Sequence, residues 1–539
     1  MASRPIMLAQ CTDVTRPWPR LFNLLSVARL VSLLSNSTLT LIRKSRMVVD
    51  DLVGDVAALI MRVEDSHPED EERHPIRDAG INRFPTELLI QIFLCCLQDK
   101  PLRDQRSSRL MLGWINITYV CQRWRDVALD CAHLWTHVSI GMGDAWVEEM
   151  LLRSGQKDLY LDDLNSHYSE WSVPEVRRKG LIKQNAYRVR SIDMNPIQPE
   201  DIIKAFDQPV PRLEHMHLRD SVDMGGNSVQ ILNAPKLRHL KLDGLAHRFS
   251  WTSSELHNLV TLHLSSKGQG LASTSVGEVI DALHGMPLLE SLVLHYCVPH
   301  AAPGHASASH RAVKLARLRN CSIYGRLHAV AYLITVLCLP ADVQLDLDLW
   351  MGDNLDVPTE PNALAPLISI LTTYIHPGLR QLALRGPTGR VVQHPQLQLL
   401  AYRTDDTHDP DVKLKFTLMD QRFHTLFHFL SQSLPVAHIR RLSISLNPGA
   451  PFWTAILGRA VSLHEVTAYS QAGLSFCWAL AHFDMPADAA TGHRNTAITE
   501  LILHNVEFSA KSAHTICSVQ RIYPGGIYPA TDESVAGYI

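Results

Sequence analysis

The chain has 539 residues, of which 46% are hydrophobic and 19% are charged. This composition is typical of a folded protein and excludes a mostly disordered chain, which would be richer in charge and poorer in apolar residues. The 51 basic and 54 acidic residues give a net charge of −3. Nothing in this balance favours nucleic acid or an anionic membrane as the principal partner.

The ten cysteines form no C-x-x-C pair and no small-scaffold spacing. A reducing compartment, the cytoplasm or the nucleus, is therefore the simpler assignment. The most apolar runs, residues 21–34 and 327–339, are shorter than the roughly 20 residues that a membrane-spanning helix needs. We expect no transmembrane segment and no zinc ribbon.

Residues 1–49 carry seven Lys or Arg and one acidic residue, Asp13. Mitochondrial transit peptides share this composition, but without a clean cleavage signal we expect a disordered basic leader and keep mitochondrial targeting as a minor alternative. Residues 50–80 reverse the sign of the charge. The sequence here predicts a helix over about 47–63, followed by a solvated acidic linker.

Residues 81–140 have the dense apolar spacing of a small helical module. A helix over 85–97 would begin at Pro85, whose missing N–H is tolerated in a first turn. Its apolar side chains fall on two lines, one with Leu88 and Ile92 and the next with Phe93. That is more apolar surface than a single buried face requires.

A polar, Arg-rich loop is predicted over 101–113, and a second helix over 114–129. Val120, Cys121 and Trp124 share the apolar line of this second helix with Ile117 and Ala128. A short turn then ends in Leu134 and Trp135.

The segments I-N-R-F-P-T-E-L-L at 81–89, V-C-Q-R-W at 120–124 and Leu134-Trp135 together resemble an F-box of the fungal F-box plus leucine-rich-repeat type. The resemblance implies that the module docks Skp1, which would join it to a cullin-RING ubiquitin ligase, and that downstream repeats select the substrate. It also implies which residues form the F-box core and the Skp1 contact: Pro85, Leu88, Ile92, Phe93, Val120, Cys121, Trp124, Leu134 and Trp135. The excess apolar surface of the module independently favours a partner site, with packing against the rest of the chain as the alternative.

Short Leu-rich segments recur beyond residue 145 at intervals of roughly 20–35 residues, which is typical of a solenoid. Seven of them follow the pattern L-x-x-L-x-L, starting at Leu213, Leu237, Leu259, Leu289, Leu379, Ile439 and Ile498. Weaker copies occur at 159–161, 189–194, 315–318 and 343–349, and helix-like stretches at 276–284, 363–374 and 423–430. The expected fold class is therefore α/β, with a small all-helical F-box module followed by an irregular leucine-rich-repeat solenoid over 145–510 and a loose tail over 519–539.

Motifs for nucleotide binding, zinc proteolysis and serine hydrolysis are absent from the sequence. The densest metal-like cluster is His295-x-Cys297-x-x-His300, with His305 and His310 beyond it. Zinc accepts these ligand types, but the spacing fits no familiar zinc module and 28 histidines make chance clustering easy. His424 and His428 lack the glutamate of a metalloprotease helix. We therefore expect no enzyme, no cofactor and no metal.

Three functions of different classes remain open. The leading one is a non-catalytic substrate receptor of a Skp1–cullin–F-box (SCF) ubiquitin ligase. The second is an interaction scaffold in which the helical module caps the repeats. The third is a hydrolase or metalloenzyme with an unrecognised site.

A candidate substrate site follows from strand geometry. If the leucines of each strand point into the core, the alternating positions face outward. That places five basic side chains on neighbouring strands: His215, His217, Arg219, His239 and Lys241. Such a patch would suit an acidic or phosphorylated peptide, and a merely solvated face is the alternative reading.

Overall fold

The computed structural model describes residues 84–98, 100–103, 110–163, 175–194, 209–219, 234–246, 249–251, 254–266, 275–299, 311–351, 371, 374, 378–386, 396–403, 410–418, 423–482, 498–504 and 527–529. The chain divides into two compact units, one of Met1–Leu218 with Asn233–Lys236, the other of Arg219–Leu232 with Leu237–Ile539. The predicted leader and the predicted helix and acidic linker lie outside the described residues, as does nearly all of the predicted helix at 363–374. Among the described helices, none has both the length and the apolar character to cross a membrane.

The first unit begins with the helical module. Its elements are α4 (Thr86–Cys95), the 3₁₀ helix η4 (Cys96–Gln98), β1 (Leu102–Arg103), β2 (Leu110–Met111), the 3₁₀ helix η5 (Gly113–Tyr119), α5 (Gln122–Asp130) and the 3₁₀ helix η6 (Ala132–Trp135). The module is helical but not wholly so, because β1 and β2 pair antiparallel within the predicted loop.

The single helix predicted over 114–129 is wrong, because two helices occupy this segment. Cys121 lies between them with an extended backbone, φ −155° and ψ 171°, and its Sγ accepts a hydrogen bond from the N–H of Trp124. A side chain that accepts from the third helical N–H is the ordinary N-cap arrangement. The continuous apolar spacing concealed this break.

Parallel strands follow the module in the first unit. They are β3 (His137–Ser139), β4 (Leu159–Asp162), β5 (Val189–Met194) and β6 (His215–Arg219), each paired with the next. Between them lie the 3₁₀ helix η7 (Ile140–Met142), α6 (Asp144–Arg153), α7 (Glu175–Asn185) and the 3₁₀ helix η8 (Ala186–Arg188).

The second unit continues the same design with more strands. β7 (His239–Asp243), β8 (Thr261–Ser265), β9 (Ser291–His295), β11 (Asn320–Arg326), β13 (Gln344–Met351) and β16 (Val412–Leu418) pair in parallel in that order. β15 (Gln396–Tyr402) runs antiparallel to both β16 and β14 (Gln381–Arg385). β17 (Arg441–Ile444), β18 (Glu465–Tyr469), β19 (Glu500–His504) and β20 (Ile527–Pro529) then add in parallel to β14.

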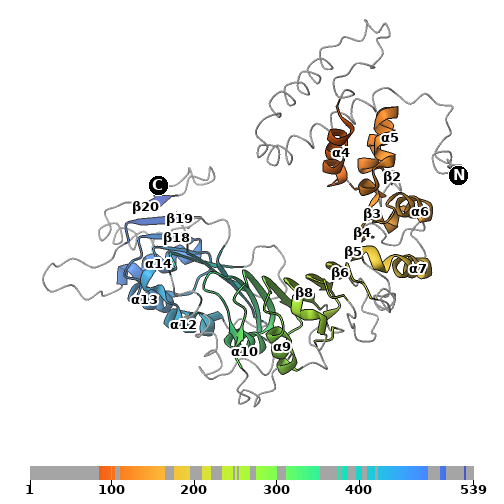
Figure 1. Cartoon of the computed structure of the whole chain (residues 1–539). Coiled ribbons are helices and arrows are strands. Elements are labelled where there is room, and N and C mark those ends of the chain that lie inside the picture. Colours follow the sequence, from red (N-terminus) through yellow and green to blue (C-terminus); the bar gives the residue numbers. More distant parts are fainter. Residues whose placement is uncertain are drawn as a thin grey trace, which may run out of the picture. The chain divides into compact units, whose positions relative to one another are not determined.

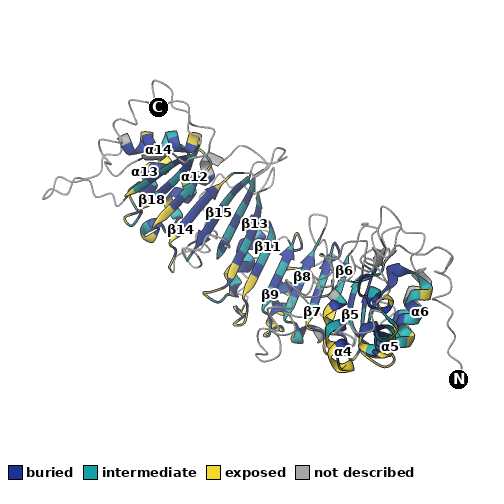
Figure 2. Ribbon diagram, turned by 90° about the horizontal axis from the view of Figure 1, so that it is seen from above, coloured by how far each residue is buried: buried dark blue, intermediate teal, exposed yellow. Residues whose placement is uncertain are grey.

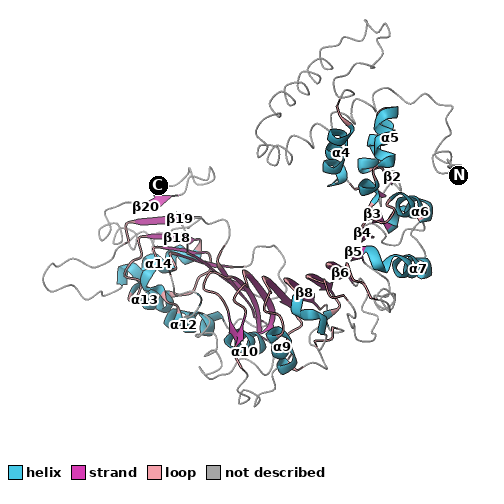
Figure 3. Ribbon diagram, viewed as in Figure 1, coloured by secondary structure: helices cyan, strands magenta, loops and turns pink. Residues whose placement is uncertain are grey.

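Helices connect many of these strands. They are α9 (Val276–His284), α10 (Leu327–Val336), α12 (Phe423–Ser433), α13 (Ala450–Leu457) and α14 (Gln471–His482), with 3₁₀ helices η10 (Ser254–Asn258) and η14 (Val436–His438) and a small parallel pair of β10 (Val313–Lys314) with β12 (Leu337–Cys338). α9, α10 and α12 lie on the same side of the strands (Figures 1 and 3). α9 starts with a capping box, in which Ser275 and Glu278 each accept a backbone N–H of the other.

Alternating burial explains why these segments are strands. In β8, Leu262 and Leu264 are fully buried, whereas Thr261 and His263 are half-buried on the opposite face. Figure 2 shows the same alternation along the neighbouring strands. The buried face packs against the helices, and the other face carries polar side chains.

All seven predicted Leu-rich segments contain a strand, and the mixed α/β class is confirmed. The predicted strand at 315–318 is wrong, because these residues form the turn between β10 and β11. Strands β3, β10, β11, β12, β15, β16 and β18 were not predicted, and β20 lies within the segment expected as a tail.

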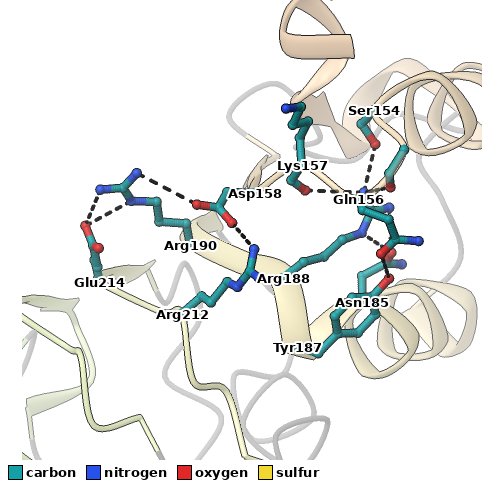
Figure 4. A network of polar contacts seen from close by, with 11 residues as sticks. Ser154, Gln156, Lys157, Asp158, Asn185, Tyr187, Arg188, Arg190, Arg212 and Glu214 are labelled. Atoms are coloured by element: carbon teal, nitrogen blue, oxygen red, sulfur yellow. Dashed lines mark hydrogen bonds and ion pairs between the residues drawn. The ribbon is translucent and has the colours of Figure 1, made fainter.

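A buried arginine holds two of the connections of the first unit together (Figure 4). Arg188 is 4% exposed, and its guanidinium donates to Ser154 Oγ and to the carbonyls of Gly155 and Lys157 after α6. It also donates to Asn185 Oδ1 at the end of α7, at 2.8 and 3.0 Å. Burial lowers the pKa of Arg188, so these hydrogen bonds compensate the desolvation of its charge.

A second, more exposed network lies beside it. Arg190 pairs with Glu214 at 2.9 Å and more loosely with Asp158 at 3.8 Å, and Arg212 pairs with Asp158 at 2.6 Å. The hydrogen bond that Arg190 donates to the Glu214 carboxylate is the main reason why the pKa of Arg190 is raised. These pairs are partly solvated, so each contributes little to stability.

The two arginines give a matched test. Arg188→Met should lower the free energy of unfolding by about 1.5–3 kcal/mol, because it leaves buried carbonyls without their charged donor. Arg190→Met should cost less than about 1 kcal/mol. Urea unfolding of both variants measures the difference, and equal losses would contradict a special role for Arg188.

Candidate functional site

The helical module sorts its apolar side chains into a core and an exposed set. Leu89 and Phe93 of α4 are fully buried, whereas Leu88 on the adjacent line is 45% exposed. Pro85 is the exposed residue that precedes the first helical turn, and its carbonyl accepts the N–H groups of Leu88 and Leu89. Ile92 is half-buried.

Aromatic contacts build the core of the module. The rings of Phe93 and Trp124 lie 5.1 Å apart between α4 and α5, and those of Trp114 and Trp135 meet edge-to-face at 5.1 Å. Trp135 Nε1 donates to the carbonyl of Ala128 at 2.9 Å. Such pairs add to the stabilisation from burial alone.

The end of η5 and the turn before α5 present two more apolar side chains to solvent. Tyr119 is 43% exposed and Val120 is 37% exposed. The extended backbone at Cys121 interrupts the helical path directly after them. Val120 therefore does not lie on the buried line that the spacing predicted.

The nine residues expected for the F-box core and the Skp1 contact thus fall into three groups. Phe93, Trp124, Leu134 and Trp135 are buried, Ile92 and Cys121 are half-buried, and Pro85, Leu88 and Val120 are exposed. Sequence reasoning missed Tyr119 as an exposed residue, since a continuous helix gave it no special place. Hydrophobicity alone did not distinguish the two roles.

Residues 81–141 match the family model for F-box-like domains. This segment is an F-box-like domain. The match agrees with the predicted module at 81–140, and it covers the core and the exposed apolar residues alike. A search of curated proteins gave no match.

The predicted basic patch begins on β6, beyond the F-box-like domain. His215 is exposed and His217 is half-buried, with its Nδ1 3.0 Å from Asp193 Oδ1. Burial is the main cause that lowers the pKa of His215. Arg219 is half-buried at the end of β6.

The other two patch residues lie on β7 of the second unit. His239 Nδ1 is 3.1 Å from Thr261 Oγ1, and Lys241 Nζ is 3.2 Å from Asp243 Oδ2. His263 Nε2 approaches the other oxygen of Asp243 at 3.1 Å. Carboxylates therefore lie beside His217 and Lys241, two of the five basic residues of the predicted patch. The role of this patch in substrate binding stays a prediction.

On the outward face of the second unit, aspartates of β13 lie beside lysines of β16. Lys413 pairs with Asp346 at 3.3 Å, and Lys415 pairs with Asp348 at 2.7 Å. Both pairs join β16 to β13 in register. Sequence reasoning did not find them, because the partners are separated by 67 residues.

Aromatic side chains adjoin these ion pairs. His295 stacks on Tyr324 with centroids 3.8 Å apart, and His295 Nε2 lies 3.0 Å from Ser322 Oγ. Burial raises the pKa of Tyr324 to about 12 and lowers the pKa of His295 to about 4. Both groups are therefore neutral at physiological pH.

The metal-like cluster is only partly within the described chain. His295 lies on the outward face as above, and Cys297 is buried, which raises its thiol pKa. His300, His305 and His310 lie outside the described residues. Over the residues that the structure describes, no three His, Cys, Asp or Glu gather into a possible metal site.

Replacing a buried aromatic residue should unfold the F-box-like domain. Trp135→Ala is expected to cost about 3–5 kcal/mol, because it removes the contact with Trp114 and leaves a cavity. Leu88→Ala, at an exposed position, should cost less than about 1.5 kcal/mol. Hydrogen exchange of the domain in the full-length chain measures both losses of stability. Protection in Trp135→Ala equal to that of the wild type would rule out a core role for Trp135.

His295 predicts a pH dependence of stability. Its pKa is about 4 in the folded chain and 6.5 for the unperturbed side chain, so between these values the unfolded state binds more protons. The free energy of unfolding should therefore fall as the pH drops from 6.5 towards 4, with no effect of this group above that window. His295→Gln should flatten the dependence in urea titrations. Identical pH profiles for the variant and the wild type would contradict the assignment.

Proposed function

We propose that this chain is the substrate-recognition subunit of an SCF-type E3 ubiquitin ligase. In this role it is not an enzyme itself and uses no cofactor. The F-box-like domain docks Skp1, and Skp1 connects the chain to a cullin-RING ligase. The observation that carries the proposal is an F-box-like domain with apolar side chains left exposed on α4 and on the turn before α5.

The physical support comes from Leu88, Tyr119 and Val120. Each keeps more than a third of its surface in water, although Leu89, Phe93 and Trp124 of the same domain are buried. Burying that apolar area against a partner would supply the main favourable term of association. Tyr119 combines an apolar ring with a polar hydroxyl, and side chains of this kind are enriched at interfaces.

We further propose that the parallel strand and helix units are leucine-rich repeats of the fungal F-box type and form an irregular solenoid that binds the substrate. Seven strands with the L-x-x-L-x-L pattern support this, as does the one-to-one register of neighbours such as β8 and β9. The same proposal places the protein in the cytoplasm, the nucleus or both, where its cysteines stay reduced.

Skp1 binding should depend on the exposed line of α4. Leu88→Asp should weaken Skp1 binding by about tenfold or more, because a carboxylate would have to be desolvated where an apolar side chain was buried. Co-purification and titration of recombinant Skp1 with the full-length chain measure the loss.

Leu152→Asp provides the matched control. Leu152 lies on α6 and is 76% exposed, so the same substitution adds the same charge outside the proposed interface. Skp1 affinity should be unchanged in this variant. If Leu88→Asp stays folded and binds Skp1 as tightly as the control, the F-box-like helices do not dock Skp1 and the interaction-scaffold reading is favoured.

A further inference from the structure

The residues that directly follow three strands of the second unit share an unusual backbone conformation with positive φ, which we call the corner. Gly244 after β7, Tyr296 after β9 and Ser470 after β18 have φ values of 80°, 56° and 50°. This left-handed region suits glycine and disfavours bulky side chains. The corner is a recurring feature, since the N–H groups of Tyr296 and Ser470 each donate to the next strand at 2.8 Å.

Glycine is therefore the residue that this corner favours, and Tyr296 occupies it at a cost in conformational free energy. Strain of this kind is often retained where the side chain has a task. The tyrosine does not serve as a core residue, because 43% of its surface is exposed.

Tyr296 belongs to a group of rings that we call the aromatic surface, formed by His263, His295, Tyr296 and Tyr324. The ring of Tyr296 meets Tyr324 edge-to-face at 6.3 Å, Tyr324 stacks on His295, and His295 lies 5.5 Å from His263. His263, His295 and Tyr324 lie on β8, β9 and β11, and Tyr296 directly follows β9, which pairs with both of the other strands. Burial raises the pKa of Tyr296, so its hydroxyl remains protonated.

The charges next to the aromatic surface are internally balanced. Asp243 is shared by Lys241 and His263, and the pairs Asp346–Lys413 and Asp348–Lys415 follow on the other side. A strongly acidic or basic ligand would have to compete with these pairs. An uncharged ligand would leave them intact and could pack against the ring of Tyr296, which is 43% exposed.

We propose that the aromatic surface around Tyr296 binds an uncharged segment of a protein substrate through a proline or aromatic anchor residue. Aromatic-lined surfaces bind such segments because rings offer large rigid apolar area together with hydroxyl donors. This inference rests on the proposed role of the chain as a substrate receptor. It assigns the docking site to residues of β8, β9 and β11 and the turn after β9, whereas the predicted basic patch lies on β6 and β7.

The backbone geometry supplies a discriminating variant. Tyr296→Gly removes the ring but relieves the strained corner, so the folded state should be as stable as the wild type or more so. Ser470→Gly makes the same backbone change at the equivalent corner after β18 and is the matched control. Should Tyr296→Gly fold poorly, Tyr296→Asn keeps a residue that tolerates this conformation.

The probe is a displayed library of random peptides, selected on the full-length chain in complex with Skp1. The wild type and Ser470→Gly should enrich uncharged peptides that contain proline or aromatic residues, with an affinity that changes little between low and high salt. Tyr296→Gly should bind the selected peptides about tenfold or more weakly, the size of loss typical of an interface hot spot.

Three results would overturn the proposal: no enriched peptide, enrichment of acidic or basic peptides, or equal binding by Tyr296→Gly. Acidic peptides would instead support the predicted basic patch. Skp1 binding by the same proteins is read separately. Its absence in the wild type refutes the SCF assignment, whereas its retention in Tyr296→Gly confines the effect to the substrate side.

Discussion

Burial of every second strand residue is the constraint on which the rest of the structure depends. A strand such as β9 can place Leu292 and Leu294 in the core only if Ser291, Val293 and His295 face the other way. In-register pairing of neighbouring strands then aligns the outward residues into rows across the sheet. The core therefore fixes where polar and aromatic side chains can meet on the opposite face of the sheet.

The F-box-like domain obeys the same rule with a helical period. The two apolar lines of α4 cannot both face one small core, so Leu89 and Phe93 are buried and Leu88 is left exposed. The extended cap residue Cys121 has a similar effect on Tyr119 and Val120, because it ends one helix before the next begins. Exposure of apolar residues here is a consequence of packing geometry.

The outward face of the second unit combines two kinds of chemistry. Within each ion pair between β13 and β16 the two charges neutralise each other, whereas the rings of His295 on β9 and Tyr324 on β11 stack and are uncharged. Recognition at such a face would rely on shape and apolar contact more than on long-range attraction. The strained corner at Tyr296 adds a ring that the sheet itself does not require.

Local periodicity and a contiguous motif were enough to predict the class of fold, the F-box-like domain and the position of the seven Leu-rich strands. They missed β15 and β16, whose antiparallel pairing is set by neighbours distant in the chain, and the break at Cys121, which spacing cannot reveal. The packing of the elements separates the exposed Leu88 and Val120 from the buried Trp124 and Trp135, and it brings Lys415 to Asp348. Burial and charge pairing are properties of packed elements, so residues of one chemical type acquire different roles only after the chain has folded.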